Sequence, residues 1–177
     1  MEAAKKIYTV NDIYSLPDGQ RAELINGELY MMAPPSRLHQ QITGEIYRQT
    51  ANHIAENKGR CKAYIAPFAV FLDADDKTYT EPDISVVCDE GKLDDRGCNG
   101  APDWIVEVVS PSSRKMDYMI KLFKYQAAGV REYWIVEPVE RIVTVYSFEA
   151  NDLHRYSFSE PIKSGIIQSL TINLSEI

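Results

Sequence analysis

The order of apolar and polar residues follows two periods, one of about 3.6 residues and one of about two, and these predict the secondary structure. Helical spacing predicts three helices, at residues 9–17, 36–59 and 113–130. Alternating or continuous apolar runs predict strands at 21–33 (two, around the turn Asn26-Gly27), 61–73, 81–88, 101–110, 131–138, 141–148 and 152–159. The apolar segment 166–177 is expected to dock as a last strand.

The order of these elements predicts the fold class. Residues 89–100 form a polar stretch rich in Gly and Asp, which we expect to be a loop. A helix, strands, a second helix and further strands indicate a mixed α/β (α+β) fold, with one curved sheet flanked by helices and an N-terminal hairpin. Since 177 residues suit one core, we expect a single domain over 1–177.

The helix predicted at 113–130 has an apolar stripe that we expect to face the sheet. The stripe consists of Met116, Met119, Ile120, Phe123 and Ala127. A polar stripe borders it and consists of Asp117, Lys121, Lys124 and Tyr125. The spacing of three and four residues sets these polar side chains beside one another on the helix.

Composition and charge narrow the possible classes of protein. The chain is 45% hydrophobic and 25% charged, which is ordinary for a globular protein. No apolar run approaches the roughly 20 residues of a membrane span, and none near the N-terminus is typical of a signal peptide, so we expect a cytoplasmic protein. The net charge of −7 argues against a tight, non-specific nucleic-acid binder.

The cysteine pattern indicates free thiols. The three cysteines are Cys61, Cys88 and Cys98, and none belongs to a C-x-x-C pair. An odd number of cysteines without regular spacing argues against a disulfide scaffold and against a zinc site.

One carboxylate lies inside an apolar run. Glu107 is surrounded by valines and isoleucine in "WIVEVV", which otherwise reads as a buried strand. A buried ionised carboxylate must be paired, must coordinate a metal or must take up a proton. Glu107 therefore needs a partner.

A second acid lies at the start of the preceding strand. Asp83 follows Pro82 in "EPDISVV", and it approaches Glu107 if the two strands are neighbours. Two close carboxylates repel unless a positive group lies between them. That group is either a divalent cation, for which carboxylate oxygens suit magnesium or manganese, or a lysine. Lys121 of the following helix is a candidate, with Lys124 and Lys115 as competitors.

At these residues the sequence resembles a known family. The segments "EPDISVV", "APDWIVEVVSPSS" and "DYMIKLFKYQAAGVREYWIVEP" are similar to the Uma-type family of putative restriction endonucleases, within the wider PD-(D/E)XK nuclease superfamily. The similarity runs from about residue 21 to residue 146. It implies a restriction endonuclease-like core.

The resemblance also implies site residues. It places the two acids of the motif at Asp83 and Glu107, as ligands of Mg²⁺ or Mn²⁺. The lysine of the superfamily would stand at position 109, where this chain has valine, and the family's displaced lysine matches Lys121. Glu23 and His39 match weaker positions and are expected beside the site as supporting groups.

The implied activity is metal-dependent hydrolysis of phosphodiester bonds in DNA by a homodimer. Two other readings stay open. A nuclease-like fold could have lost cleavage and serve as a binding or regulatory module, or the chain could be a structural protein in which Glu107 forms an ion pair without a metal. Lys121 could equally be an exposed partner of Asp117 on its own helix.

Overall fold

A computed structural model describes residues 6–111 and 113–177. Its centre is a mixed six-stranded sheet in the order β11-β10-β9-β8-β5-β3, where β8 and β9 are parallel and the other pairs are antiparallel. The strands are β3 (Lys62–Ile65), β5 (Ile84–Val87), β8 (Trp104–Val108), β9 (Glu132–Glu137), β10 (Ile142–Ser147) and β11 (Asp152–Ser157). This confirms the predicted fold class.

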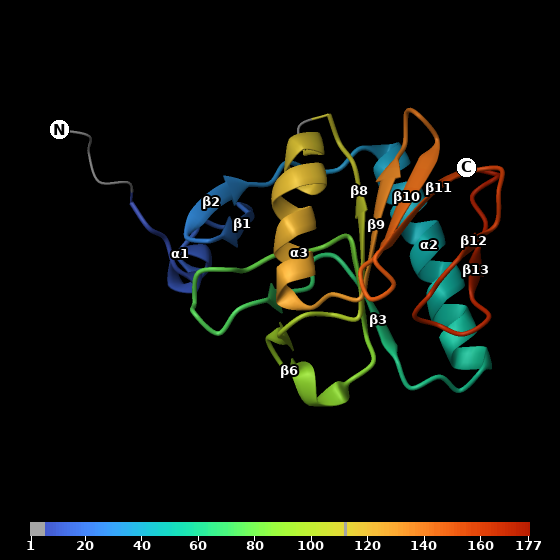
Figure 1. Ribbon diagram of the computed structural model, residues 1–177. Helices are drawn as coiled ribbons and strands as arrows, with labels where there is room; N and C mark the ends of the chain where they lie inside the picture. The colour runs from blue at the N-terminus through green and yellow to red at the C-terminus, as the bar shows by residue number, and fades with distance from the viewer. Residues whose placement is uncertain (1–5, 112) are drawn as a thin grey trace.

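Helices cover the two faces of the sheet (Figure 1). Helix α2 (Arg37–Glu56) contributes Ile42 and Ile46 to one core, together with Trp104 and Val106 of β8. On the other face, the π-helix η2 (Met116–Lys121) continues into α3 (Leu122–Ala128), and Ile105 of β8 belongs to that second core. Because side chains alternate along a strand, β8 supplies both cores and is buried along its whole length.

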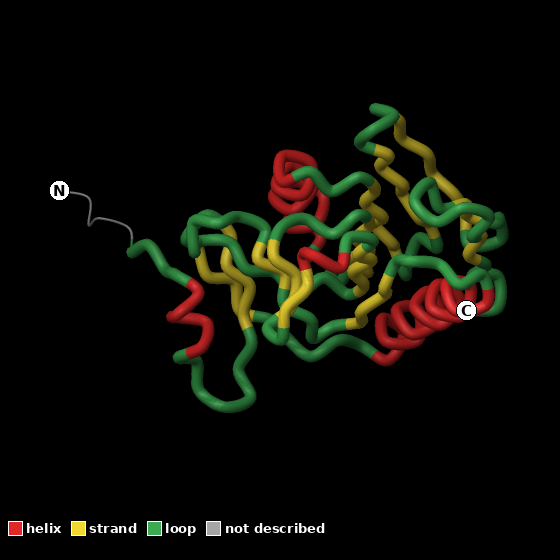
Figure 2. The backbone as a smooth tube through the Cα atoms, turned by 90° about the horizontal axis from the view of Figure 1, so that it is seen from below, coloured by secondary structure: helices red, strands yellow, loops and turns green. Residues whose placement is uncertain are grey.

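Smaller elements surround the sheet. The N-terminal hairpin pairs β1 (Ala22–Ile25) with β2 (Glu28–Met31), and its turn has Asn26 and Gly27 at φ 51° and 80°, as the Asn-Gly signal predicts. The helix α1 (Val10–Tyr14) precedes it. The last short pair is β12 (Ile162–Lys163) with β13 (Thr171–Ile172). Figure 2 shows α1 and the hairpin at one end of the molecule and α2 at the other.

Two segments differ from the sequence prediction. Residues 61–73 do not form one strand, because β3 ends before Pro67, β4 (Val70–Phe71) begins after it, and the two join different sheets. Residues 89–100 are not only a loop. They form a 3₁₀ turn, η1 (Glu90–Lys92), then β6 (Leu93–Asp94) and β7 (Gly97–Asn99), which complete a small sheet with β4.

The helix after β8 turns its polar stripe inward, which corrects the prediction for residues 113–130. Asp117, Lys121 and Tyr125 are buried, whereas the Met119 and Phe123 side chains are 52% and 67% exposed. The reason lies in the sheet, where the helix meets a buried carboxylate from β8. Packing of the polar stripe satisfies that carboxylate, and an apolar stripe could not.

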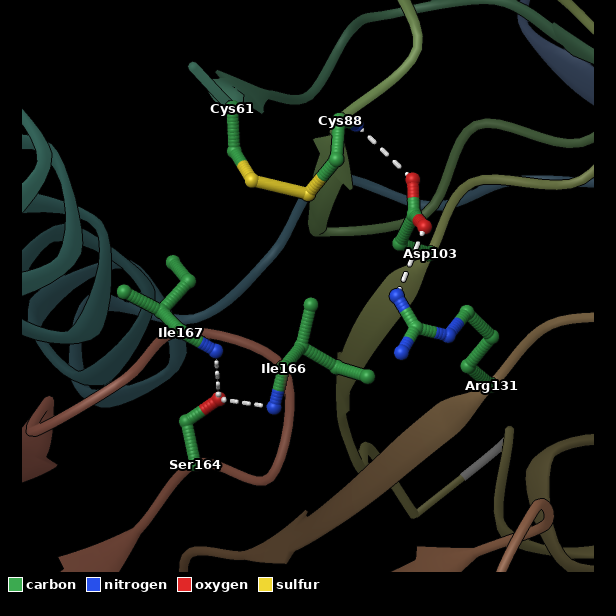
Figure 3. The surroundings of a disulfide bond; sticks show 7 residues. All are labelled: Cys61, Cys88, Asp103, Arg131, Ser164, Ile166 and Ile167. Atoms are coloured by element: carbon green, nitrogen blue, oxygen red, sulfur yellow. Dashed lines mark hydrogen bonds and ion pairs between the residues drawn. A yellow bond between two sulfur atoms is a disulfide. The ribbon is translucent and has the colours of Figure 1, made fainter. Parts of the chain in front are cut away.

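The cysteine prediction is wrong for two of the three residues. Cys61 and Cys88 form a disulfide with an S–S distance of 2.07 Å, and only Cys98 is a free, buried thiol. Figure 3 shows the bond next to Asp103, whose Oδ2 accepts a hydrogen bond from the Cys88 amide at 2.8 Å. The pairing of Lys62 with Val87 in β3 and β5 sets the two cysteines opposite each other, and sequence spacing does not reveal that register.

Within the described residues, no helix combines the length and the apolar character that crossing a bilayer requires.

Candidate active site

Glu107 has partners inside the core. Its side chain on β8 is buried, with 5% of its surface exposed. Its Oε1 accepts hydrogen bonds from Lys121 Nζ and from the Tyr125 hydroxyl, both at 2.8 Å. Both donors belong to the helical segment η2–α3, four residues apart, so they lie on the side of the helix that faces β8.

Lys121 also forms an ion pair with a second carboxylate, from a distant part of the chain. Its Nζ lies 2.8 Å from Glu23 Oε2 on β1 and 3.8 Å from Asp117 Oδ1. The other oxygen of Glu23 accepts the Glu81 amide at 3.0 Å, which fixes the carboxylate in place. The predicted supporting residue Glu23 thus shares one ammonium group with Glu107.

The helical segment that carries Asp117 and Lys121 has an unusual geometry. Residues 116–121 form a π-helix, a rare geometry that often occurs at functional sites. Ser113 donates from Oγ to Asp117 Oδ2 at 2.7 Å, and Tyr133 of β9 donates to the Asp117 carbonyl at 3.2 Å. These contacts hold the first turns of the segment against the sheet.

Negative charge exceeds positive charge in this core. Burial raises the pKa of Glu107 well above its ordinary value, and Asp117, Asp83 and Glu23 raise it further against the opposing effect of Lys121. Burial also raises the pKa of Asp117. Burial lowers the pKa of Lys121, but the charges of Glu107, Glu23 and Asp117 outweigh it and hold that pKa well above the ordinary value. The ammonium is therefore charged, and three acidic side chains surround it.

Asp83 lies beside this cluster, just before β5. Its Oδ2 accepts the amide of Val108, the residue next to Glu107, at 2.7 Å. The same oxygen lies 3.1 Å from His39 Nε2, and the Asp83 side chain remains 17% exposed. Ile84 of β5 pairs with Val106 of β8, so the two strands are neighbours. The sequence predicts that Asp83 and Glu107 approach each other under this condition.

His39 comes from the first turn of α2. Ser36 caps that helix and accepts the His39 amide on its hydroxyl oxygen at 3.2 Å. Burial lowers the pKa of His39, but the hydrogen bond and charge of Asp83 and the Val108 backbone outweigh it, so the pKa is raised overall. The imidazole thus fixes one oxygen of Asp83.

The structure brings all five predicted site residues into one region. Glu107, Lys121 and Glu23 meet directly. Asp83 accepts the Val108 amide of the same strand, and His39 contacts Asp83. The alternative of an exposed Lys121–Asp117 pair is wrong, because both side chains are buried.

The competing lysines lie elsewhere. Lys124 pairs with Asp73 and donates to Asn26 Oδ1 at 2.7 Å, away from Glu107. Sequence reasoning gave no role in the site to Tyr125 and treated Asp117 only as a partner of Lys121. Their spacing of four residues on either side of Lys121 was the signal for both.

The donor set suits a hard divalent cation. Glu107 offers carboxylate oxygens on β8 and Asp83 offers them just before the adjacent strand β5, although residues 6–111 and 113–177 contain no group of three or more His, Cys, Asp and Glu side chains placed to hold a metal. Mg²⁺ commonly binds through one or two carboxylates and takes its remaining ligands from water and substrate phosphates. Two carboxylates therefore suffice for this ion.

Comparison with known proteins identifies the class. The chain resembles a solved structure described as a putative nuclease belonging to DUF820 from Anabaena variabilis ATCC 29413, with a TM-score of 0.69 and 22% identity over 96% of this chain and 92% of that one. At this identity the likeness shows a shared fold. No curated protein sequence matches the chain.

The family is shown by sequence. The model of the Uma2 family, described as putative restriction endonucleases, matches residues 10–175. The chain belongs to this family, which confirms the resemblance found in the sequence motifs. Nucleases with this type of fold generally use divalent metal ions.

Proposed function

We propose that the protein is an Mg²⁺- or Mn²⁺-dependent endonuclease that hydrolyses phosphodiester bonds in DNA. The observation that carries this proposal is the position of Lys121, whose Nζ lies 2.8 Å from both Glu107 and Glu23 beside the acid Asp83. Buried charged groups of raised pKa that converge on one point are typical of catalytic sites.

Each residue has a role in the proposed reaction. Asp83 and Glu107 would hold the ion, which would polarise the phosphate and lower the pKa of the attacking water. Lys121 orients the attacking water and stabilises the negative charge that develops on the phosphate oxygens. The water gives up a proton to solvent as its oxygen bonds to phosphorus, the bridging P–O bond breaks, and the leaving oxygen takes a proton from solvent.

Two further residues position these groups. His39 holds Asp83 Oδ2 at 3.1 Å, and Glu23 holds Lys121 Nζ at 2.8 Å. Loss of a group that orients a metal ligand typically lowers metal affinity or activity about 10- to 100-fold. Because two copies of the site suit cleavage of both strands of a duplex, the proposal includes a homodimer.

The test is cleavage of supercoiled plasmid and of single-stranded DNA with Mg²⁺ or Mn²⁺, and with a chelator as the blank. We expect the wild type to cut and both Glu107→Gln and Lys121→Ala to lose cleavage while still folded by circular dichroism. Lys124→Ala is the matched control, since Lys124 contacts Asp73 and Asn26, and it should retain cleavage. Equal cleavage by Lys121→Ala and wild type would remove the lysine from the mechanism.

One observation favours a second function, that of a nuclease-like binding module that no longer cuts. Lys121 neutralises part of the charge of Glu107 and Glu23. The same ion pair suits a structural protein with no metal site. Absence of cleavage on every substrate, together with a metal-dependent rise in melting temperature, would support the binding module. Absence of both would support the structural protein.

A further inference from the structure

A second feature of the molecule is an open pocket of about 640 Å³ between the start of η2 and the strands β10 and β11. It lies on the face of the sheet that η2 and α3 cover, where the sheet extends beyond the helix (Figure 1). We call it the η2–β11 groove. Its lining residues are Pro111, Arg114, Lys115, Tyr118, Met119, Thr144, Tyr146, Leu153 and Arg155.

The groove is positively charged in an acidic protein. Its lining includes Arg114, Lys115 and Arg155 and no Asp or Glu, whereas the chain carries a net charge of −7. Glu137 and Glu140 hold the Arg114 guanidinium at 3.0 and 3.1 Å, so part of its charge is compensated. Glu140 also lies 4.0 Å from the Arg155 guanidinium, so the charge of Arg155 is compensated in part as well. The Arg155 side chain is nevertheless 58% exposed and Lys115 is exposed, so both can meet an anion.

Aromatic rings lie among these cations. Tyr146 of β10 is flanked by the rings of Tyr133 and Phe148, at 6.3 and 6.2 Å between centroids, and these neighbours fix its orientation. The Arg114 guanidinium lies 5.6 Å from the centre of the Tyr118 ring. A groove that combines cations with oriented aromatic rings is typical of proteins that bind single-stranded nucleic acid, because bases stack on the rings while cations contact phosphates.

The groove lies close to the candidate active site along the chain. Pro111 is four residues beyond Glu107, so their Cα atoms are at most about 14 Å apart. In η2, Tyr118 and Met119 line the groove, while Asp117 and Lys121 of the same turns face Glu107. The start of η2 therefore borders both the groove and the candidate active site.

We propose that the η2–β11 groove binds an unpaired stretch of the nucleic-acid substrate beside the bond that is cut. A base stacks against Tyr118 or Tyr146, and the flanking phosphates contact Lys115 and Arg155. An unpaired stretch fits better than a duplex, because paired bases hide their faces in the helical stack. The identity of the substrate rests on the proposed function, but binding to the groove does not require cleavage.

Strand β11 offers a matched pair of variants. Leu153 lines the groove and is 49% exposed, and His154 points to the opposite face of the strand because side chains alternate. Leu153→Glu and His154→Glu therefore each introduce one acid on the same exposed edge strand, but only the first lies in the groove. Both should fold like the wild type.

The experiment measures binding of a fluorescein-labelled oligothymidylate by anisotropy in the presence of chelator. We expect Leu153→Glu to raise Kd about tenfold or more, since an acid set against phosphates costs more than the 1.4 kcal/mol that corresponds to tenfold, and His154→Glu to leave Kd nearly unchanged. The double variant Lys115→Ala, Arg155→Ala should have a shallower dependence of the binding constant on salt. The slope of log K against the logarithm of the salt concentration should fall in magnitude by about 1.4, or about 0.7 for each phosphate that is no longer neutralised. The control Lys163→Ala, in the exposed part of β12, should bind like the wild type.

Photo-crosslinking locates the base directly. An oligonucleotide with one 5-iodouracil should crosslink to Tyr118 or Tyr146, as identified by mass spectrometry of the peptides. Equal binding by Leu153→Glu and His154→Glu would overturn the groove proposal even if the protein cleaves plasmid. Loss of binding in Leu153→Glu alone would support the groove even if no cleavage is found, and the nuclease proposal would then fail separately. If Leu153→Glu instead dissociates a dimer in sedimentation and binds normally, the groove is a subunit interface and the proposal is wrong.

Discussion

Lys121 and Glu107 form an ion pair of 2.8 Å in which both side chains are buried to about the same extent, each with 6% of the side chain exposed. Neither group is stable alone in such a place, since an unpaired buried charge costs several kcal/mol. Glu23 contributes a second carboxylate to the same ammonium at 2.8 Å. The pair therefore ties η2 to both the central sheet and the N-terminal hairpin.

Replacing one partner of the Lys121–Glu107 pair should destabilise the protein. We expect Lys121→Met to lower the free energy of unfolding by about 3–5 kcal/mol, because it leaves the carboxylates without their cation. Adding Glu107→Gln to Lys121→Met should recover part of the loss, because it removes one uncompensated charge. Urea denaturation of the two single variants and the double variant measures the coupling, and additive losses would show that the pair has no coupling energy.

His39 should act through Asp83. We expect His39→Ala to raise the Mg²⁺ concentration for half-maximal cleavage about 10- to 100-fold, because the Asp83 carboxylate loses the group that orients it. His39→Gln, which keeps a side-chain hydrogen-bond donor, should recover part of the affinity. The control is His53→Asn near the end of α2, where the half-buried imidazole forms a hydrogen bond with the Gln168 carbonyl and none with the candidate site residues. Unchanged metal dependence in His39→Ala would contradict the positioning role.

A bound ion should stabilise the fold. At a free concentration of about 100 times its Kd, an ion that binds only the folded state contributes about 2.7 kcal/mol, which raises the melting temperature of a domain of this size by about 5–11 °C. Differential scanning fluorimetry with Mg²⁺, Mn²⁺ and chelator measures this rise. Asp83→Asn should abolish it, and a rise of equal size in that variant would mean that the ion binds elsewhere.

The disulfide should contribute to stability. Cys61 and Cys88 close a loop with a sequence separation of 27 residues, for which chain entropy predicts about 3.5 kcal/mol. We expect Cys61→Ala with Cys88→Ala, or reduction of the wild type, to lower the free energy of unfolding by about 2–4 kcal/mol. Cys98→Ala is the control, since Cys98 is a free thiol.

The same bond bears on the cellular location. Disulfides are rare in cytosolic proteins, whose thiols are kept reduced, so the cytoplasmic location stays a prediction from the sequence. Counting thiols by alkylation before and after reduction, on protein quenched in acid directly from its native cells, tests it. One reactive thiol before reduction and three after it would confirm the disulfide and weigh against the cytoplasm.

The sequence alone determined the local structure and the presence of a site. The spacing of apolar residues and the residue types at the turn and the cap were enough to predict the hairpin at Asn26-Gly27 and the long helix capped by Ser36. Both features depend on residues that are neighbours in the sequence. Glu107 stood out because an acid among valines needs a partner under any fold. The motif segments then indicated the family.

Tertiary structure decided which distant groups meet. The family motif pointed to Lys121, but the contact of Lys121 rather than Lys124 with Glu107 depends on how the helix rotates on the sheet, and the apolar stripe predicted the opposite rotation. Glu23 reaches the site from a hairpin far away in sequence, and the Cys61–Cys88 bond requires the register of β3 on β5. These are long-range contacts, and their free energy depends on the burial of charge and on strand register. The local spacing of apolar and polar residues does not determine either of them.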